Sequence, residues 1–238
     1  MLSTEHFWCV VPAAGVGKRM GAPVPKQYLP LLGARVADHT LATLLRVNLF
    51  SRIVVALSAE DEWWPESSDM TSPRVLRCEG GAERFHSVLK GLDALAGLAH
   101  DEDWVLVHDI ARPCVRLSDI ERLVSAVRGH PVGGLLASPV RDTMKRADAS
   151  GAVAETVDRQ GLWHALTPQM FRYGLLRTAI REGMDRGLAM TDEASAMEAQ
   201  GYAPLLIEGA ADNIKITHPQ DLALAALFLQ QRQAQAQQ

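Results

Sequence analysis

The sequence has few cysteines, and they are not spaced for crosslinking or for binding a metal. Cys9, Cys78 and Cys114 form no CxxC pair and no Cys/His spacing of the kind found in zinc sites. An odd number of cysteines also argues against a disulfide framework. We therefore expect free thiols in a reducing, cytoplasmic environment.

Long hydrophobic runs are missing as well. Nowhere do about 18 apolar residues follow one another, so the sequence predicts no transmembrane helix. The N-terminal segment MLSTEHFWCVVP has no cationic stretch, and Pro12 interrupts the apolar run that a signal peptide needs. We expect a protein that is retained in the cell and has no membrane partner.

The chain has no excess of positive charge and no common nucleophile motif. Its 24 Lys and Arg residues against 28 Asp and Glu residues give a net charge of −4, so no global field attracts nucleic acid or anionic lipid. Phosphate chemistry would therefore need a local basic cluster. The sequence contains neither GxSxG nor HExxH, so we expect no activated serine and no zinc site.

Short apolar runs alternate with helical patterns over most of the 238 residues. This alternation indicates βαβ units, and thus an α/β fold with a Rossmann-like, mostly parallel sheet flanked by helices. We place strands at residues 7–11, 53–57, 75–78, 104–107, 134–137, 205–207 and 214–216, and helices around residues 41–45, 88–95 and 120–127. A last helix begins after Thr217-His218 at Pro219. We expect one domain over residues 1–232 and a frayed tail over 233–238.

One segment interrupts the alternation. Residues 139–159 read PVRDTMKRADASGAVAETVDR, two extended stretches around an Asp-Ala-Ser-Gly turn at 148–151, with few large apolar side chains. This pattern predicts a projecting β-hairpin arm. An isolated two-stranded hairpin is only marginally stable in water, so we expect the arm to pack on a second subunit.

A loop of small residues follows the first predicted strand and ends in cations. Residues 13–21 read AAGVGKRMG. This is not a Walker A loop, because Pro12 and Arg19 stand where that motif needs glycine and Ser or Thr. It is not a dinucleotide fingerprint either, because Met20 takes the place of the third glycine. The loop favours close approach of the backbone to a base or phosphate, with charge from Lys18, Arg19 and Lys26. A plain strand-to-helix turn with solvated cations is the alternative.

Two further segments follow predicted strands. Gly80-Gly81 precedes a helix that contains Ser87, a position suited to backbone contacts with a ligand, although a simple turn would look the same. Asp109 follows the strand WVLV at 104–107. Ligands of open α/β sheets gather beyond the carboxyl ends of the strands, where a lone carboxylate can hold Mg²⁺ bridged to phosphates. Asp109 is therefore the metal candidate. A helix cap or an ion pair with Arg112 is the alternative.

Several segments together resemble one family. The segments are AAGVGKRMGAPVPKQYLPL, GGAERFHSV, VLVHDIARP, SPVRDTMKR, TVDRQGLWHALTPQMF, TDEASAMEAQG and EGAADNIKIT, in this order. They are similar to 2-C-methyl-D-erythritol 4-phosphate cytidylyltransferases over nearly the whole chain. AAGxGxRM is shared broadly among sugar nucleotidyltransferases, whereas DTxK, TVDRxxLWxxxTPQ and NIKIT are more particular. The resemblance implies a nucleotidyltransferase fold, related to glycosyltransferase A, that converts CTP and methylerythritol phosphate to the cytidine diphosphate product and pyrophosphate.

The resemblance also implies roles for individual residues. It places Ala13, Ala14, Gly15, Gly80, Gly81 and Ser87 around the cytidine. It places Arg19 and Lys26 where charge on the triphosphate is stabilised, and Asp109 at the metal, which we expect to be Mg²⁺, and at the substrate hydroxyls. Lys18 adds positive charge to the same cluster. Arg112, Thr167, Thr191 and Lys215 would line the acceptor site, with Thr143 and Arg159 entering from the partner's arm in a homodimer. His86 departs from the family's usual R-x-D-S-V loop.

Two rival functions stay open at this point. A cytidylyltransferase of the same fold that acts on another polyol phosphate, such as ribitol 5-phosphate, would keep the CTP segments and differ around residues 143–167. A nucleotide-sensing module would bind CTP without turnover, but the intact set of cations argues against it.

Overall fold

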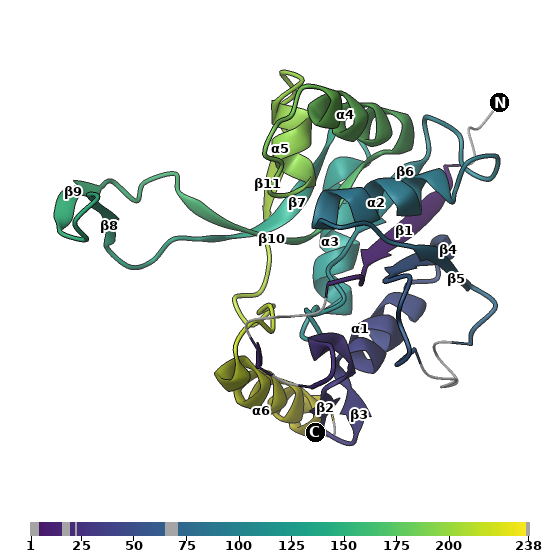
Figure 1. Cartoon of the computed structure of the whole chain (residues 1–238), viewed down its shortest axis with the longest axis horizontal. Coiled ribbons are helices and arrows are strands. Elements are labelled where there is room, and N and C mark those ends of the chain that lie inside the picture. The colour runs from purple at the N-terminus through teal and green to yellow at the C-terminus, as the bar shows by residue number, and fades with distance from the viewer. Residues whose placement is uncertain (1–4, 16–19, 22, 65–70, 237–238) are drawn as a thin grey trace.

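A computed structural model describes residues 5–15, 20, 21, 23–64 and 71–236. It contains a seven-stranded sheet in the order β11-β7-β10-β6-β1-β4-β5 (Figure 1). In chain order the strands are β1 (Phe7–Pro12), β4 (Phe50–Leu57), β5 (Val75–Glu79), β6 (Trp104–Val107), β7 (Gly133–Pro139), β10 (Trp163–Arg172) and β11 (Leu205–Glu208). Neighbouring strands are parallel, except that β10 runs antiparallel to both β6 and β7. The predicted α/β fold with a mostly parallel sheet is confirmed.

Helices cover both faces of this sheet. They are α1 (Val36–Leu45) and α3 (Leu117–Val127) on one face, and α2 (Arg84–Asp93), α4 (Tyr173–Asp185) and α5 (Glu193–Glu198) on the other. Successive side chains of β1 point to opposite faces of the sheet. Cys9 and Val11 pack with α1 and α3, whereas Trp8 and Val10 pack with α2 and α4. Because both faces are covered, the central strands read as continuous apolar runs.

The C-terminal helix α6 (Pro219–Ala236) begins where the sequence predicts. It closes a third apolar cluster with Leu31 and Val36, next to the 3₁₀ turn η2 (Lys26–Tyr28) and the short strands β2 (Pro30–Leu31) and β3 (Ala34–Arg35). The helix continues through residues 233–236 of the predicted tail. In the described part of the chain, no helix is both long and apolar enough to cross a bilayer.

The strand predicted at residues 214–216 is wrong. This segment lies outside the sheet and links it to α6 as irregular backbone. The N–H of Ile216 donates to the carbonyl of Ala111 at 2.9 Å, and Lys26 Nζ donates to the carbonyl of Ile216 at 2.7 Å. A loop and a side chain therefore supply the partners that a neighbouring strand would have supplied, and they hold Lys215 near the end of β6.

The predicted hairpin is present as β8 (Met144–Ala147) and β9 (Val153–Val157), which pair antiparallel and extend away from the rest of the molecule (Figure 1). Asp148 Oδ1 closes the turn by accepting hydrogen bonds from the N–H groups of Ser150 (2.8 Å) and Ala152 (3.0 Å). Gly151 has φ +85°, a backbone conformation that glycine adopts without a steric cost.

Candidate active site

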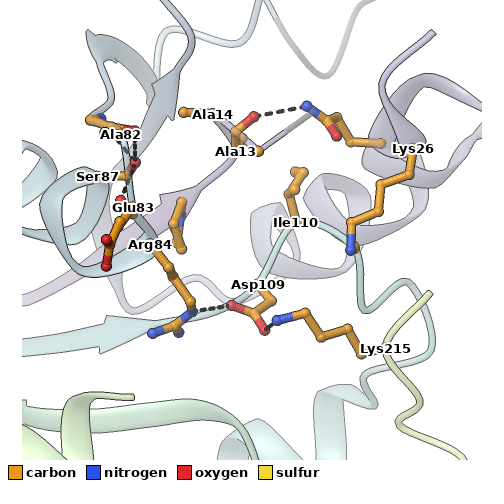
Figure 2. Close-up of a pocket in the computed structure, with 15 residues that line it drawn as sticks. Ala13, Ala14, Lys26, Ala82, Glu83, Arg84, Ser87, Asp109, Ile110 and Lys215 are labelled. Carbon is orange, nitrogen blue, oxygen red and sulfur yellow. Dashed lines mark hydrogen bonds and ion pairs between the residues drawn. The ribbon is translucent and has the colours of Figure 1, made fainter. Parts of the chain in front are cut away.

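A pocket lies beyond the carboxyl ends of β1, β5 and β6. Because these strands are parallel or connected through parallel neighbours, the loops that follow them meet at one edge of the sheet. The lining residues are Pro12, Ala13, Ala14, Gly15, Lys26, Gln27, Gly81, Ala82, Glu83, Arg84, Ser87, Asp109, Ile110, Ala111 and Lys215. Two glycine-containing loops, one central carboxylate and several cations thus converge, as Figure 2 shows.

The first loop is held by backbone contacts and one buried amide. The N–H of Ala13 donates to the carbonyl of Ala56 at 2.8 Å, and Gln27 Nε2 donates to the carbonyl of Ala13 at 2.8 Å. Gln27 is only 2% exposed, so its side chain holds the backbone of Ala13 rather than contacting solvent. The predicted Lys18 and Arg19 lie outside the described residues.

The second loop packs directly on the first. A Cβ placed on Gly80 would lie 2.5 Å from the Cβ of Ala14, so glycine is needed here for loop-to-loop contact and not only for ligand access. Ser87 Oγ accepts a hydrogen bond from the N–H of Gly81 at 3.0 Å and thereby closes the loop against α2. His86 Nδ1 accepts from the N–H of Glu83 at 3.3 Å, so this ring helps to cap α2.

Asp109 lies at the centre of a cluster of cations. Its Oδ1 accepts from Arg84 Nε at 2.7 Å, and its Oδ2 lies 2.8 Å from Lys215 Nζ (Figure 2). Arg112 Nε lies 3.7 Å from the same Oδ2. The carboxylate side chain is 8% exposed. Burial alone would raise the pKa of Asp109, but Arg84, Lys215 and Arg112 outweigh it and hold that pKa well below its usual range. Asp109 is therefore an anion at neutral pH.

A buried hydrogen-bond chain fixes the backbone on either side of this carboxylate. Burial lowers the pKa of His108 to about 4, so its ring is neutral. His108 Nε2 faces the carbonyl of Arg112 at 3.2 Å, and a carbonyl can only accept; Nε2 therefore carries the proton. Nδ1 must then accept from the hydroxyl of Thr167 at 3.0 Å, and that oxygen accepts from the N–H of Asp109 at 3.1 Å. The His108 ring, the Thr167 hydroxyl and the N–H of Asp109 therefore all have hydrogen-bond partners.

The acceptor-side residues lie next to the pocket. Lys215, which lines the pocket, also lines a neighbouring hollow together with Arg112, Arg141 and His164. Arg112 Nη1 donates to the carbonyl of Asn213 at 2.7 Å, which fixes the guanidinium beside Asp109. No group of three or more His, Cys, Asp or Glu side chains among the described residues is arranged to hold a metal ion. A metal at Asp109 would therefore need further ligands of another kind, such as phosphate oxygens or water.

The structure brings most of the predicted residues together but not all of them. The pocket lining contains Ala13, Ala14, Gly15, Lys26, Gly81, Ser87, Asp109 and Lys215, with Gly80 and Arg112 immediately behind or beside it. Thr167 is 4% exposed, and its hydroxyl takes part in the buried hydrogen bonds with His108 and Asp109. Thr191 is exposed next to α5, and its N–H donates to Ser195 Oγ at 3.1 Å. Thr143 and Arg159 are exposed on the arm, where Arg159 donates to the carbonyl of Arg141 of its own chain.

Sequence reasoning missed several residues that support this site. Arg84 and Glu193 form a bidentate ion pair, with Nη1 to Oε1 at 2.6 Å and Nη2 to Oε2 at 3.0 Å, although they are 109 positions apart. Gln27 and His108 hold backbone groups in place. Arg84 lies at the start of a helix after a glycine loop, in the segment GGAERFHSV, and Glu193 lies in the segment TDEASAMEAQG, but nothing in the sequence indicates that the two side chains pair.

An open sheet whose parallel strands end in glycine-containing loops, with cations gathered around one carboxylate, is typical of enzymes that transfer nucleotidyl groups. Comparison with known proteins agrees. The family model for 2-C-methyl-D-erythritol 4-phosphate cytidylyltransferase matches residues 7–231. Relatives of that name from Hahella chejuensis (53% identical over 226 residues, 94% of each chain) and Ectopseudomonas mendocina (54% over 223 residues, 93% of this chain and 94% of the other) are similar to this chain.

A solved structure leads to the same family. The crystal structure of the Francisella tularensis 2-C-methyl-D-erythritol 4-phosphate cytidylyltransferase is 34% identical, with a TM-score of 0.82 over 94% of this chain and 100% of that one. The chain belongs to the 2-C-methyl-D-erythritol 4-phosphate cytidylyltransferase family. Its activity is the transfer of a cytidylyl group from CTP to 2-C-methyl-D-erythritol 4-phosphate, which gives 4-diphosphocytidyl-2-C-methyl-D-erythritol in non-mevalonate isoprenoid biosynthesis.

Proposed function

We propose that this cytidylyl transfer takes place beside Asp109, with CTP in the pocket beyond β1, β5 and β6 and the acceptor in the hollow next to it. The observation that carries the proposal is the position of Asp109, which faces Arg84 on one side and Lys215 and Arg112 on the other. The cytidine is assigned to Ala13, Ala14, Gly15, Gly80, Gly81 and Ser87. Thr167 supports Asp109 from behind, and Thr191 borders the acceptor.

The reaction needs no nucleophile from the protein. A phosphate oxygen of the acceptor forms a bond to the α-phosphorus of CTP, while the bond from that phosphorus to the bridging oxygen of the β-phosphate breaks. Pyrophosphate leaves with the bonding electron pair. Catalysis then consists of aligning two anions and stabilising charge on the leaving group. Lys18, Arg19 and Lys26 are assigned to the triphosphate, and Lys215 and Arg159 to the acceptor phosphate.

We assign Mg²⁺ to Asp109 together with the phosphates of CTP. In nucleotide sites Mg²⁺ is usually held by one or two carboxylates plus phosphate oxygens, and the single carboxylate of Asp109 fits that donor set. The ion would neutralise charge on the phosphates when bound. Lys215, now 2.8 Å from Asp109 Oδ2, is placed to contact an acceptor phosphate at the same spot.

The arm supports a homodimer with shared sites. Every residue of β8 is exposed, and in β9 Val153 is 64% exposed. A hairpin that buries so little of itself is expected to gain its stability from another surface, and the surface available to every copy is a second copy. In this arrangement Thr143 and Arg159 enter the partner's acceptor site, and residues 1–232 act as one nucleotidyltransferase domain.

The activity is tested by pyrophosphate release with a panel of substrates. We expect turnover with CTP and methylerythritol phosphate in the presence of Mg²⁺, much slower turnover with ATP, because a cytosine-sized pocket excludes purines, and loss of activity in EDTA. Equal rates with ribitol 5-phosphate would refute the acceptor assignment. Binding of CTP without turnover on any acceptor would support a sensing module instead.

Subunit mixing tests the shared site. Lys26→Ala and Arg159→Ala proteins, each inactive, are mixed under conditions that allow subunit exchange. In a hybrid dimer one site loses both residues, and the other takes Lys26 from one chain and Arg159 from its partner. With random pairing, about half of the dimers are hybrids, so about a quarter of all sites should regain activity. No recovery despite verified exchange would mean that Arg159 acts within its own chain.

A further inference from the structure

The guanidinium of Arg84 joins three parts of the site. Arg84 is the first residue of α2 and directly follows the second glycine loop. Its Nε contacts Asp109, at the end of β6, and its two terminal nitrogens contact Glu193, the first residue of α5. Glu193 follows Thr191 and Asp192 in sequence, so one side chain connects the nucleotide loop, the central carboxylate and the acceptor side.

Glu193 is buried in a way that stability alone does not explain. The side chain of Glu193 is 1% exposed, whereas that of Arg84 is 23% exposed. Both carboxylate oxygens of Glu193 contact Arg84. Burial raises the pKa of Glu193, although Arg84 opposes the rise. A buried ion pair is often no more stabilising than apolar residues of the same volume, because both charges lose their hydration. Glu193 therefore points to a geometric role.

The geometry of the pair decides how Asp109 is contacted. A guanidinium carries five N–H groups in a fixed plane, and the bidentate contact with Glu193 uses its two terminal nitrogens. That leaves Nε for Asp109 Oδ1, a single contact at 2.7 Å (Figure 2). Without Glu193, the terminal nitrogens of Arg84 would be free to form a bidentate contact with both oxygens of Asp109. Arg84 would then also contact Oδ2 of Asp109, the oxygen that faces Lys215 in this structure.

We propose that Arg84 and Glu193 form a positioning pair, in which Glu193 orients Arg84 so that it holds only Oδ1 of Asp109 and leaves Oδ2 to Lys215 and Arg112, on the side assigned to the acceptor. The inference rests on the function proposed above. Glu193 contacts no reacting atom in this scheme, and it acts through Arg84 on the orientation of the central carboxylate. The pair also fixes the start of α5, and with it the segment that carries Thr191, relative to the nucleotide loop.

A double-mutant cycle on kcat tests the pair. Glu193→Gln keeps the shape but removes the charge and one acceptor oxygen, and Arg84→Lys keeps the charge but removes the fork. We expect each change to lower kcat by roughly 10–100-fold, the range seen when residues that orient a ligating side chain are replaced. KM for CTP should change much less. Because Glu193 acts through Arg84, the double variant should be no slower than Arg84→Lys.

Controls separate positioning from folding. Glu198→Gln makes the same chemical change at an exposed position of the same helix and should leave kcat and the melting temperature unchanged. If Glu193→Gln does not fold, the cycle is run with Glu193→Asp, which keeps the charge and shortens the reach. Multiplicative effects of the two changes, or an unchanged kcat in a folded Glu193 variant, would overturn the pair.

The same assay distinguishes failure of the pair from failure of the function. If the wild-type protein releases pyrophosphate from CTP with methylerythritol phosphate and the variants match it, the pair is refuted and the function stands. If the wild-type protein shows no such activity, the proposed function is refuted. A lower melting temperature with unchanged kcat would show a purely structural ion pair and would also refute the positioning role.

Discussion

Replacing Asp109 by Asn should destabilise the fold as well as abolish activity. The change keeps the shape of the side chain but removes the negative charge that faces Arg84, Lys215 and Arg112. The amide that replaces one oxygen also presents N–H donors to groups that can only donate. Three cations then share a largely buried space, with Glu193 as the remaining anion in contact with Arg84.

The size of this effect follows from the burial of the carboxylate. The side chain of Asp109 is 8% exposed, and removing one partner of a buried ion pair typically costs about 3–5 kcal/mol. For a chain of this length, each kcal/mol shifts the melting temperature by about 2–4 °C. We therefore expect Asp109→Asn to melt about 6–20 °C below the wild-type protein at neutral pH.

Asp93→Asn is the matched control. Asp93 Oδ1 also contacts two cations, Arg177 and Arg181, each at 2.7 Å, but its side chain is 39% exposed. Exposed ion pairs typically contribute about 0–1 kcal/mol, so this variant should lose no more than a few degrees. Asp109 faces three cations and Asp93 two, so the larger difference between the sites is burial, and a comparison of melting temperatures tests its effect.

The pH dependence of the melting temperature gives a second check. The folded-state pKa of Asp109 lies well below its unfolded value, so its contribution to stability is present above the unfolded pKa, about 3.9, and is lost as the pH falls through the folded pKa. The gap between wild type and Asp109→Asn should thus be constant from about pH 7 to 5 and shrink below about pH 4. An Asp109→Asn protein as stable as wild type at pH 7, or less affected than Asp93→Asn, would refute this reasoning.

Three further predictions concern the same site. Lys26→Ala should lower kcat by roughly 10²–10³ with a smaller effect on KM, because a donor directed at transition-state charge acts on the chemical step; a change confined to the KM for CTP would contradict this role. Thr167→Val leaves the N–H of Asp109 and Nδ1 of His108 unpaired and should lower the free energy of unfolding by about 2–4 kcal/mol in chemical denaturation. Thr167→Ser should lower it by under about 1.5 kcal/mol, and equal losses for the two variants would argue against the hydrogen-bond chain. Gly80→Ala should raise the KM for CTP more than the KM for methylerythritol phosphate, since its Cβ would push the two loops apart, and an unchanged KM for CTP would refute this packing role.

The sheet and its central carboxylate could be predicted because both depend on local signals. The strand at 104–107 is a short apolar run, and the carboxylate after it had to emerge at the carboxyl edge of a parallel sheet. The arm was also readable from its polar composition and its turn residues. By contrast, residues 214–216 have the apolar pattern of a strand, but this pattern does not show whether a neighbouring strand is available for pairing. In the structure the N–H of Ile216 donates to a loop carbonyl, that of Ala111, instead.

The supporting contacts could not be read from sequence because they join distant segments. Arg84 meets Glu193 across 109 positions, and Thr167 meets His108 across 59. Each of these side chains alone is compatible with an exposed position. The resemblance to the family marked Thr167 as important but not why, and only the fold reveals that its hydroxyl lies behind Asp109. Whether Thr143 and Arg159 act in trans remains a prediction.

The antiparallel insertion of β10 has a consequence for how the chain folds during synthesis. The strands β1, β4, β5 and β6 all precede residue 108, and β7, β10 and β11 all follow residue 132, so the two halves of the sheet meet only where β10 pairs with β6. The ribosome must therefore deliver the whole arm before this seam can close. Because synthesis proceeds at about 5–20 residues per second, several seconds pass between the synthesis of Asp109 and that of the strand that contains Thr167. The interval before Lys215 is synthesised is longer. Any chaperone that binds the nascent chain has this interval in which to protect the exposed edge of β6.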